Sequence, residues 1–389
     1  MAGSVDASTV AKNTASAHHR AAVAAAVVEV CRGEPPALAG NDTVRAAFVA
    51  AVRHHRVAPL AHVLLREPDP PVAAELKTDR DAAMIRHLTA SVVLDDIGRT
   101  LGELPWVTIK GPVLSEHAHP APGLRSYTDV DTLVPPEHLR AAVEALLAAD
   151  WQVIDFRDML CNVQTPGEMH LVSPRGVLVD MHWSLINMQQ TRRQFSIDTD
   201  ALLARRVTRP VGGAATWTLD TADSLIHVCL HAALTGAHKM LWLLDADQLA
   251  RQVDDWDDVA RRAAAWGAAP AVAIVLARSR ALLGTPLPRD LDRRLGVSAG
   301  FRLVTGAVDR FRPVPGLTRE ASLPRLVARS ARPTGGRTLS AIGRRGLRGV
   351  GERLRPGGRA GDGAEREPAD AAALAAYLDA VEAHARTAT

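Results

Sequence analysis

The chain has 389 residues and a mass of 41.5 kDa, which is too long for one compact core and long enough for two or three units of ordinary domain size. Hydrophobic residues make up 47% and charged residues 23%, a balance that excludes wholesale disorder. The net charge of +3 is unevenly distributed, because residues 325–359 hold ten arginines and one acid. This segment therefore carries +9 and the rest of the chain −6, so the basic total does not by itself indicate a nucleic-acid partner.

The cysteines and the uncharged runs bear on the compartment. Cys31, Cys161 and Cys229 are far apart and odd in number, which argues against a disulfide framework and favours a reducing cytoplasm. The sequence shows no cysteine spacing typical of structural zinc and no secretory signal. The longest uncharged run, Ala263–Ala277, has 15 residues, fewer than the roughly 20 that a membrane-spanning helix needs. We expect a cytoplasmic protein without a membrane partner.

The N-terminal part, residues 1–101, is predicted to be helical after a frayed start at 1–15. Ala21–Val30 consists of strong helix formers, and Asn41 and Asp42 are typical of a helix start. A long helix is expected over Val72–Leu101, with Met84, Leu88 and Val92 on one apolar face.

Residues 102–220 have the texture of a small α/β core. Short strand runs are listed here in chain order: Trp106–Ile109, Thr128–Val134, Trp151–Ile154, Met169–Ser173, Val177–Trp183 and Thr216–Leu219. Pro174–Gly176 separates two of these runs as the turn of a β-hairpin would, and residues 139–149 show the periodicity of an amphipathic helix.

The C-terminal part is helical again over 221–324. Residues 325–368 are rich in Gly, Arg and Pro without apolar periodicity, which predicts a flexible linker, and 369–389 holds a last helix. The predicted fold class is α+β, with a small mixed-sheet core at 102–220 flanked by N-terminal and C-terminal helical regions.

Three aspartates stand out in the core. Asp129 and Asp131 are two residues apart in a strand run, so their carboxylates share one face, and Asp180 lies between apolar neighbours in another strand run. Carboxylates that share a face repel each other unless a cation lies between them, and a hard divalent cation suits such oxygen ligands. The alternative is that the Asp-x-Asp pair arises by chance at a surface turn. His182 falls on the face of Asp180.

A second group of residues suits a phosphate. Lys110 and Gly111 follow a strand and open a helix, where glycine allows close backbone approach and the helix start favours an anion. An ordinary strand–helix turn explains the same pair. Arg125 either reaches a phosphate or pairs with one of the acids.

Together these residues resemble the nucleotidyltransferase superfamily with the polymerase-β-like fold. The segments Ile109-Lys-Gly, Pro122-Gly-Leu-Arg-Ser-Tyr-Thr-Asp-Val-Asp-Thr-Leu-Val134 and Val179-Asp-Met-His-Trp183 are similar to a group of largely uncharacterised bacterial nucleotidyltransferases. The likeness covers about 105–290. It departs from the superfamily at Pro112, because that residue removes an N–H where the superfamily usually has a second Gly or a Ser.

The resemblance implies a chemistry and a set of site residues. Asp129, Asp131 and Asp180 would be catalytic and would hold two Mg²⁺ ions, with Mn²⁺ as a substitute. Lys110, Gly111 and Arg125 would bind the nucleoside triphosphate. His182, His231 and Lys239 would support or line the cleft, although the spacing of His227 and His231 is equally explained by helix packing.

Two functions remain open from the sequence. The first is Mg²⁺-dependent transfer of a nucleoside monophosphate to an acceptor hydroxyl or phosphate on a small molecule, peptide natural product, protein or RNA. A small molecule or peptide is favoured over a nucleic acid. The second is a non-catalytic nucleotide sensor or scaffold that retains the core. The oligomeric state is not indicated.

Overall fold

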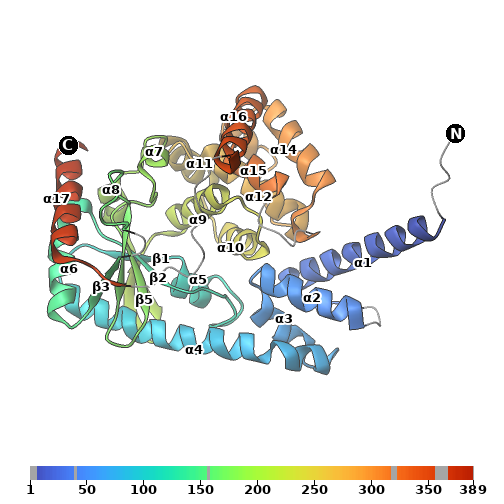
Figure 1. Cartoon of the computed structure of the whole chain (residues 1–389), viewed down its shortest axis with the longest axis horizontal. Coiled ribbons are helices and arrows are strands. Elements are labelled where there is room, and N and C mark those ends of the chain that lie inside the picture. Colours follow the sequence, from blue (N-terminus) through green and yellow to red (C-terminus); the bar gives the residue numbers. More distant parts are fainter. Residues whose placement is uncertain (1–6, 39–41, 156–157, 317–321, 355–366, 389) are drawn as a thin grey trace.

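A computed structural model of the chain describes residues 7–38, 42–155, 158–316, 322–354 and 367–388. The N-terminal region is helical, as predicted. Its helices are α1 (Ala7–Arg32), α2 (Asp42–His54), α3 (Ala58–Leu65) and α4 (Pro70–Leu101). In Figure 1, α1 to α3 lie at one end of the molecule, and α4 runs from them along the underside of the sheet.

Helix α4 begins at Pro70, just before the predicted Val72, and ends at Leu101 as predicted, but its buried face differs from the predicted one. The Asp69 side chain caps its first turn by accepting from the Val72 N–H, and Gly102 follows its end at a positive φ of 55°. Leu88 and Val92 are 58% and 43% exposed, so the predicted apolar face was wrong. Small and branched side chains of α4 are buried instead. Apolar residues occur around much of the helix, so their spacing does not indicate a single buried face.

The described residues contain one mixed sheet of eight strands in the order β6-β7-β1-β2-β5-β4-β3-β8. The strands are β1 (Val107–Ile109), β2 (Val130–Leu133), β3 (Gln152–Asp155), β4 (Glu168–Val172), β5 (Leu178–His182), β6 (Val207–Val211), β7 (Ala214–Thr218) and β8 (Glu367–Pro368). The predicted hairpin is confirmed as β4 and β5, which pair antiparallel from Glu168↔His182 to Val172↔Leu178. The expected fold class, α+β, is confirmed, and β6 and β8 are the strands that the sequence did not reveal.

The two faces of the sheet differ in what covers them. Val130, Val179 and Met181 pack into a core with α4, α6 (Leu139–Ala148) and α17 (Ala371–Ala388). Val107, Ile109 and Leu133 belong to a second core shared with α9 (Thr221–Thr235) and α10 (Met240–Ala250). Since successive side chains alternate between faces, Asp131 and Asp180 lie on this second face.

The C-terminal region packs its helices above the second face (Figure 1). The remaining helices are α5 (Gly111–His117), α7 (Gln189–Arg192), α8 (Thr199–Ala204), α11 (Trp256–Ala265), α12 (Ala269–Leu283), α13 (Leu291–Arg294), α14 (Ala299–Phe311), α15 (Leu323–Arg329) and α16 (Gly335–Leu354), with 3₁₀ turns at Pro136–His138 and Val314–Gly316. No helix of the described residues is both long and apolar enough to cross a membrane.

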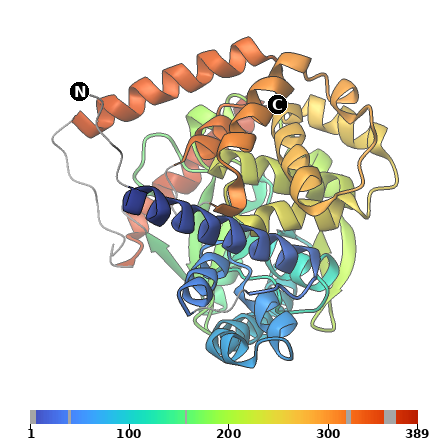
Figure 2. The same ribbon diagram turned by 90° about the vertical axis from the view of Figure 1, so that its right-hand side faces the viewer.

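Within its described residues, the segment predicted to be a flexible linker is largely helical. Helices α15 and α16 occupy 323–329 and 335–354, and Figure 2 shows α16 along the upper edge of the molecule. Its small residues serve helix packing: a Cβ at Gly335 would approach the carbonyl carbon of Gly300 in α14 to 2.6 Å, while Thr338 and Ala341 are buried. Such small contact residues give no large-apolar periodicity, which explains the error, and residues 355–366 lie outside the described part.

The C-terminal helix α17 is tied to the sheet through Tyr377. The Tyr377 hydroxyl donates to the Pro166 carbonyl at 2.7 Å and accepts from the Trp183 indole N–H at 2.9 Å. Tyr377→Phe removes these bonds and is expected to lower the free energy of unfolding by about 1 kcal/mol. Urea denaturation measures this change in the free energy of unfolding. An unchanged unfolding midpoint would contradict the stabilising role of the Tyr377 hydroxyl.

Candidate active site

A cavity of about 530 Å³ opens between the second face of the sheet and the helices that cover it. Its wall includes acids and bases from the sheet, histidines from α9 and arginines from three helical segments. Its charged and ionisable lining residues are Arg56, Lys110, Arg125, Tyr127, Asp129, Asp131, Glu168, Asp180, His182, His227, His231, Arg329 and Arg345. The size and mixed lining suit a small-molecule ligand.

The three aspartates come together in this cavity. Strands β2 and β5 are parallel neighbours, and their register places Asp131 directly beside Asp180. Asp129 immediately precedes β2 and lines the same cavity. The alternation and pairing of two short strands therefore gather three carboxylates that are separated by up to 51 positions in the sequence.

Asp131 is held by two basic side chains. Its carboxylate lies 2.9 Å from the Lys110 ammonium and 3.1 Å from Nε2 of His182. Burial alone would raise the pKa of Asp131, but Lys110 and His182 hold it well below its usual range. Burial would lower the pKa of Lys110, and the Asp131 carboxylate raises it instead. The pair is thus charged on both sides at neutral pH.

The turn between β1 and α5 presents Lys110 to this carboxylate. Lys110 has a φ of 53° and Gly111 a φ of 24°, and a Cβ at Gly111 would lie 3.5 Å from the Asp129 carbonyl oxygen. Positive φ is unfavourable for a residue with a side chain, so Lys110 occupies a strained conformation. Pro112 lies in the first turn of α5, where its missing N–H does no harm.

Strand β4 adds two groups, Glu168 and His170, that were given no role from the sequence. His170 is opposite Asp180 in the antiparallel register, and its Nδ1 lies 2.7 Å from the Asp180 carboxylate. Glu168 is opposite His182, at 3.2 Å from Nδ1. The sequence contained the pattern that places these two side chains on the site face. Glu168 and His170 are two residues apart in β4, as Asp180 and His182 are in β5, so each pair shares one face of its strand.

The donor set suits a divalent cation, although its side chains are turned toward protein partners. Burial raises the pKa of Asp129, and repulsion from Asp131 and Asp180 raises it further, so negative charge accumulates at this point. Carboxylate oxygens are the ligands that Mg²⁺ prefers. Among the described residues, no group of three or more acidic, histidine or cysteine side chains is arranged to hold a metal ion. Asp131 contacts Lys110, and Asp180 contacts His170.

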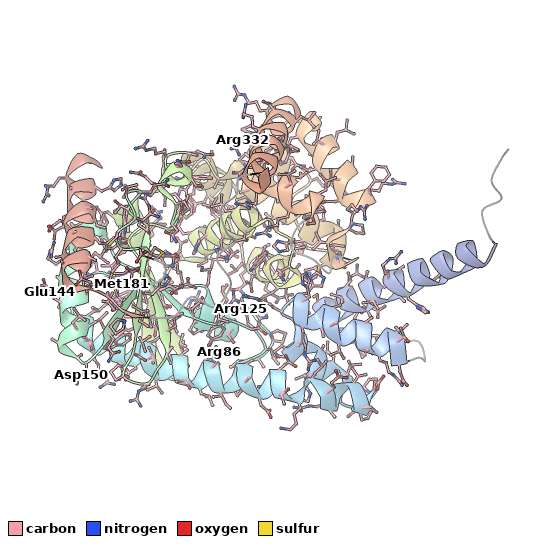
Figure 3. The ribbon with its side chains drawn as sticks, in the orientation of Figure 1. Arg86, Arg125, Glu144, Asp150, Met181 and Arg332 are labelled. Atoms are coloured by element: carbon pink, nitrogen blue, oxygen red, sulfur yellow. The ribbon has the colours of Figure 1, made fainter. Side chains whose placement is uncertain are left out.

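Arg125 forms a buried ion pair with Asp245 of α10. Its Nε and Nη2 donate to the two carboxylate oxygens at 2.9 and 2.8 Å, and Nε2 of His119 lies 2.8 Å from the same carboxylate. Figure 3 shows Arg125 in the interior, between the sheet and the helices. Of the two roles that the sequence left open, the structure shows the ion pair, with Asp245 as partner in place of the three site aspartates.

The histidines and the lysine of the helical part divide into two groups. His227 and His231 line the cavity, and burial together with nearby Lys110 lowers the pKa of His231 to about 3, so this imidazole is neutral. Lys239 lies elsewhere: its Nζ is 3.4 Å from Nδ1 of His54, and it is absent from the described wall of the cavity.

Residues 43–284 match the family described as uncharacterised nucleotidyltransferases. This is more than half of the chain. The chain belongs to this family. No curated protein matches it.

The nucleotidyltransferase family match spans α2 to α12 and contains strands β1 to β7 with the three aspartates. Arg329 and Arg345, which also line the cavity, lie beyond it in α15 and α16. The composition of 325–368 predicted a linker there, and Arg56 lies in no motif. No local pattern indicates that helices distant in the sequence enclose one cavity.

Proposed function

We propose that this nucleotidyltransferase family member transfers a nucleoside monophosphate from a nucleoside triphosphate to an acceptor hydroxyl or phosphate, with the active site built as in the polymerase-β-like superfamily. The observation that carries the proposal is the gathering of Asp129, Asp131 and Asp180 on one sheet face inside a cavity. A small molecule or a peptide natural product is the favoured acceptor, because the cavity is of small-molecule size.

Asp129, Asp131 and Asp180 are the residues that would hold Mg²⁺, as two ions that Mn²⁺ can replace. Bound there, the metal would neutralise phosphate charge and lower the pKa of the acceptor hydroxyl. The carboxylates otherwise repel each other, as the raised pKa of Asp129 indicates, so the protein itself disfavours this arrangement without a cation.

The chain's own residues account for the remaining steps. The acceptor oxygen attacks the α-phosphorus, the bond to the bridging oxygen breaks, and pyrophosphate leaves. Asp180 accepts the acceptor proton, and His170 fixes the orientation of its carboxylate through the 2.7 Å contact. Lys110 and the backbone of Gly111 favour the developing negative charge on the phosphates.

One observation favours a second function, a nucleotide sensor without turnover. The Asp131 carboxylate already has a cation in Lys110, at 2.9 Å. If that ion pair persists with nucleotide bound, the site binds a nucleotide without completing the metal centre.

The experiment that separates the two uses the purified full chain with ATP, CTP, GTP or UTP, Mg²⁺ and a panel of small-molecule and peptide acceptors. Pyrophosphate release together with an acceptor mass increase of one nucleotide is the expected result, and chelation of the metal should abolish both. Nucleotide binding without pyrophosphate release across the panel would favour the sensor.

A further inference from the structure

Strands β4 and β5 are linked across the site by two pairs of an acid and a histidine. His170 of β4 contacts Asp180 of β5, and Glu168 of β4 contacts His182 of β5. The members of each pair are opposite each other in the antiparallel register. The proposed reaction uses Asp180 and His170, but it leaves Glu168 without a role, although Glu168 lines the same cavity.

Both carboxylate oxygens of Glu168 are turned toward protein groups. Oε1 accepts from Nδ2 of Asn187, and Oε2 lies 3.2 Å from Nδ1 of His182. Asn187 is itself fixed to the backbone before β4, because its side-chain oxygen and its carbonyl oxygen accept from the Gly167 N–H at 3.0 and 2.8 Å. This arrangement argues against Glu168 as a direct metal ligand and favours a role in holding His182.

The imidazole ring of His182 connects Glu168 to Asp131. Its Nδ1 faces the Glu168 carboxylate, and its Nε2 lies 3.1 Å from Oδ1 of Asp131. The side chains of His182 and Asp131 are only 8% and 9% exposed, so water competes little for these contacts. Because carboxylates lie at both ring nitrogens, the orientation of the ring is fixed from both sides.

The two basic groups that contact Asp131 meet the same oxygen atom. The Lys110 ammonium lies 2.9 Å and Nε2 of His182 lies 3.1 Å from Oδ1. The second oxygen, Oδ2, accepts no hydrogen bond from any residue that the structure describes. A carboxylate that is held through one oxygen presents the other in a fixed direction, which is what a metal ligand of defined geometry requires.

We propose that Glu168 is a positioning residue that acts through His182: it fixes Oδ1 of Asp131 and so leaves Oδ2 as the oxygen that would ligate the divalent cation. The inference rests on the proposed function for the cation, and on the contacts among β2, β4 and β5 for the positioning. Loss of a partner that orients a metal ligand typically weakens metal binding by about 10- to 100-fold. A carboxylate in the cavity also attracts a cation at a distance, so the experiment must separate positioning from charge.

Electron paramagnetic resonance of free Mn²⁺, in titrations of the full chain, measures cation affinity without turnover. Glu168→Gln retains the shape of the side chain but loses its charge, and it should weaken Mn²⁺ binding about tenfold. In a His182→Gln background the same substitution should change the affinity by less than about twofold, because the ring through which Glu168 acts is absent. A long-range charge effect, or direct ligation by Glu168, would give the same loss in both backgrounds.

Glu144→Gln is the matched control for the loss of one glutamate charge. Glu144 is exposed on α6, lies at the edge of the molecule in Figure 3, and is not in the described cavity wall. Its Mn²⁺ affinity should stay within about twofold of the wild type, because solvent and salt screen a distant surface charge. Thermal unfolding of each variant shows that the comparison is made on folded protein.

Three results would overturn the positioning role and leave the proposed transfer standing: Glu168→Gln binds Mn²⁺ at least as tightly as the wild type, its loss is equal in both backgrounds, or Glu144→Gln loses as much. A folded wild type that binds no Mn²⁺ would overturn the positioning role together with the metal-dependent transfer. If the two substitutions are coupled as expected but no triphosphate releases pyrophosphate, the positioning role stands and the proposed transfer fails.

Discussion

Asp129→Asn should abolish nucleotidyl transfer, by about 10³-fold or more, without lowering stability. Stability should not fall because the fold disfavours the ionised form of Asp129: burial and the neighbouring Asp131 and Asp180 raise its pKa. An amide of the same shape removes the repulsion and also removes a ligand for the metal. Pyrophosphate release measures the first effect, and urea unfolding at pH 7 measures the second.

Asp131→Asn should lose activity to the same degree and lose stability as well. Asp131 is the carboxylate partner of the buried Lys110 ammonium, which is 11% exposed, and an unpartnered buried charge destabilises a protein by ~3–5 kcal/mol. The two substitutions are chemically identical and two positions apart. A difference in stability between them therefore reports the Lys110–Asp131 pair and not a general effect of removing an acid.

Asp150→Asn supplies the control for both variants. Asp150 is exposed at the end of α6, lies at the edge of the molecule in Figure 3, and has a φ of 62° that asparagine also tolerates. Its activity and unfolding midpoint should match the wild type. Retained transfer by Asp129→Asn, or a loss of stability equal to that of Asp131→Asn, would contradict the site as described.

The sequence predicted the three aspartates of this site because their arrangement depends on local strand geometry. Alternation along a strand places Asp129 and Asp131 together, and the hairpin turn at Pro174–Gly176 fixes the register of Asp180. A period of two along a strand, bounded by turn residues, is enough to predict which side chains share a face. The same alternation would have yielded Glu168 and His170 had β4 been considered with β5.

The helical side of the site could not be predicted in this way because it depends on tertiary packing. Arg125 and Asp245 are 120 positions apart, and no spacing rule pairs them. Helix α16 was missed for a related reason, since the close contact of Gly335 with Gly300 makes glycine a packing residue there, whereas glycine in a sequence usually indicates a turn or linker.

Breaking the Arg125–Asp245 ion pair should cause a large loss of stability. Asp245→Leu leaves the Arg125 guanidinium buried, at 5% exposure, without its carboxylate, and should lower the free energy of unfolding by ~3–5 kcal/mol. The double variant Arg125→Met/Asp245→Leu removes both charges and should recover at least half of that loss, because apolar side chains of similar volume replace the pair. Urea unfolding at pH 7 compares the wild type with the single and double variants.

The pH dependence of stability gives an independent measure of the same pair. Burial alone would raise the pKa of Asp245, but Arg125 and His119 lower it to about 2, below the value of about 3.9 expected in the unfolded chain. A lowered carboxyl pKa stabilises the fold above pH ~4, and this contribution is lost as the pH falls from ~4 to ~2. The wild type should therefore lose stability over this window more steeply than the double variant. The single variant Arg125→Met should flatten the same pH dependence, because Asp245 loses the guanidinium that lowers its pKa. If Arg125 bound the triphosphate instead, Arg125→Met would weaken nucleotide binding and leave the acid dependence of stability unchanged.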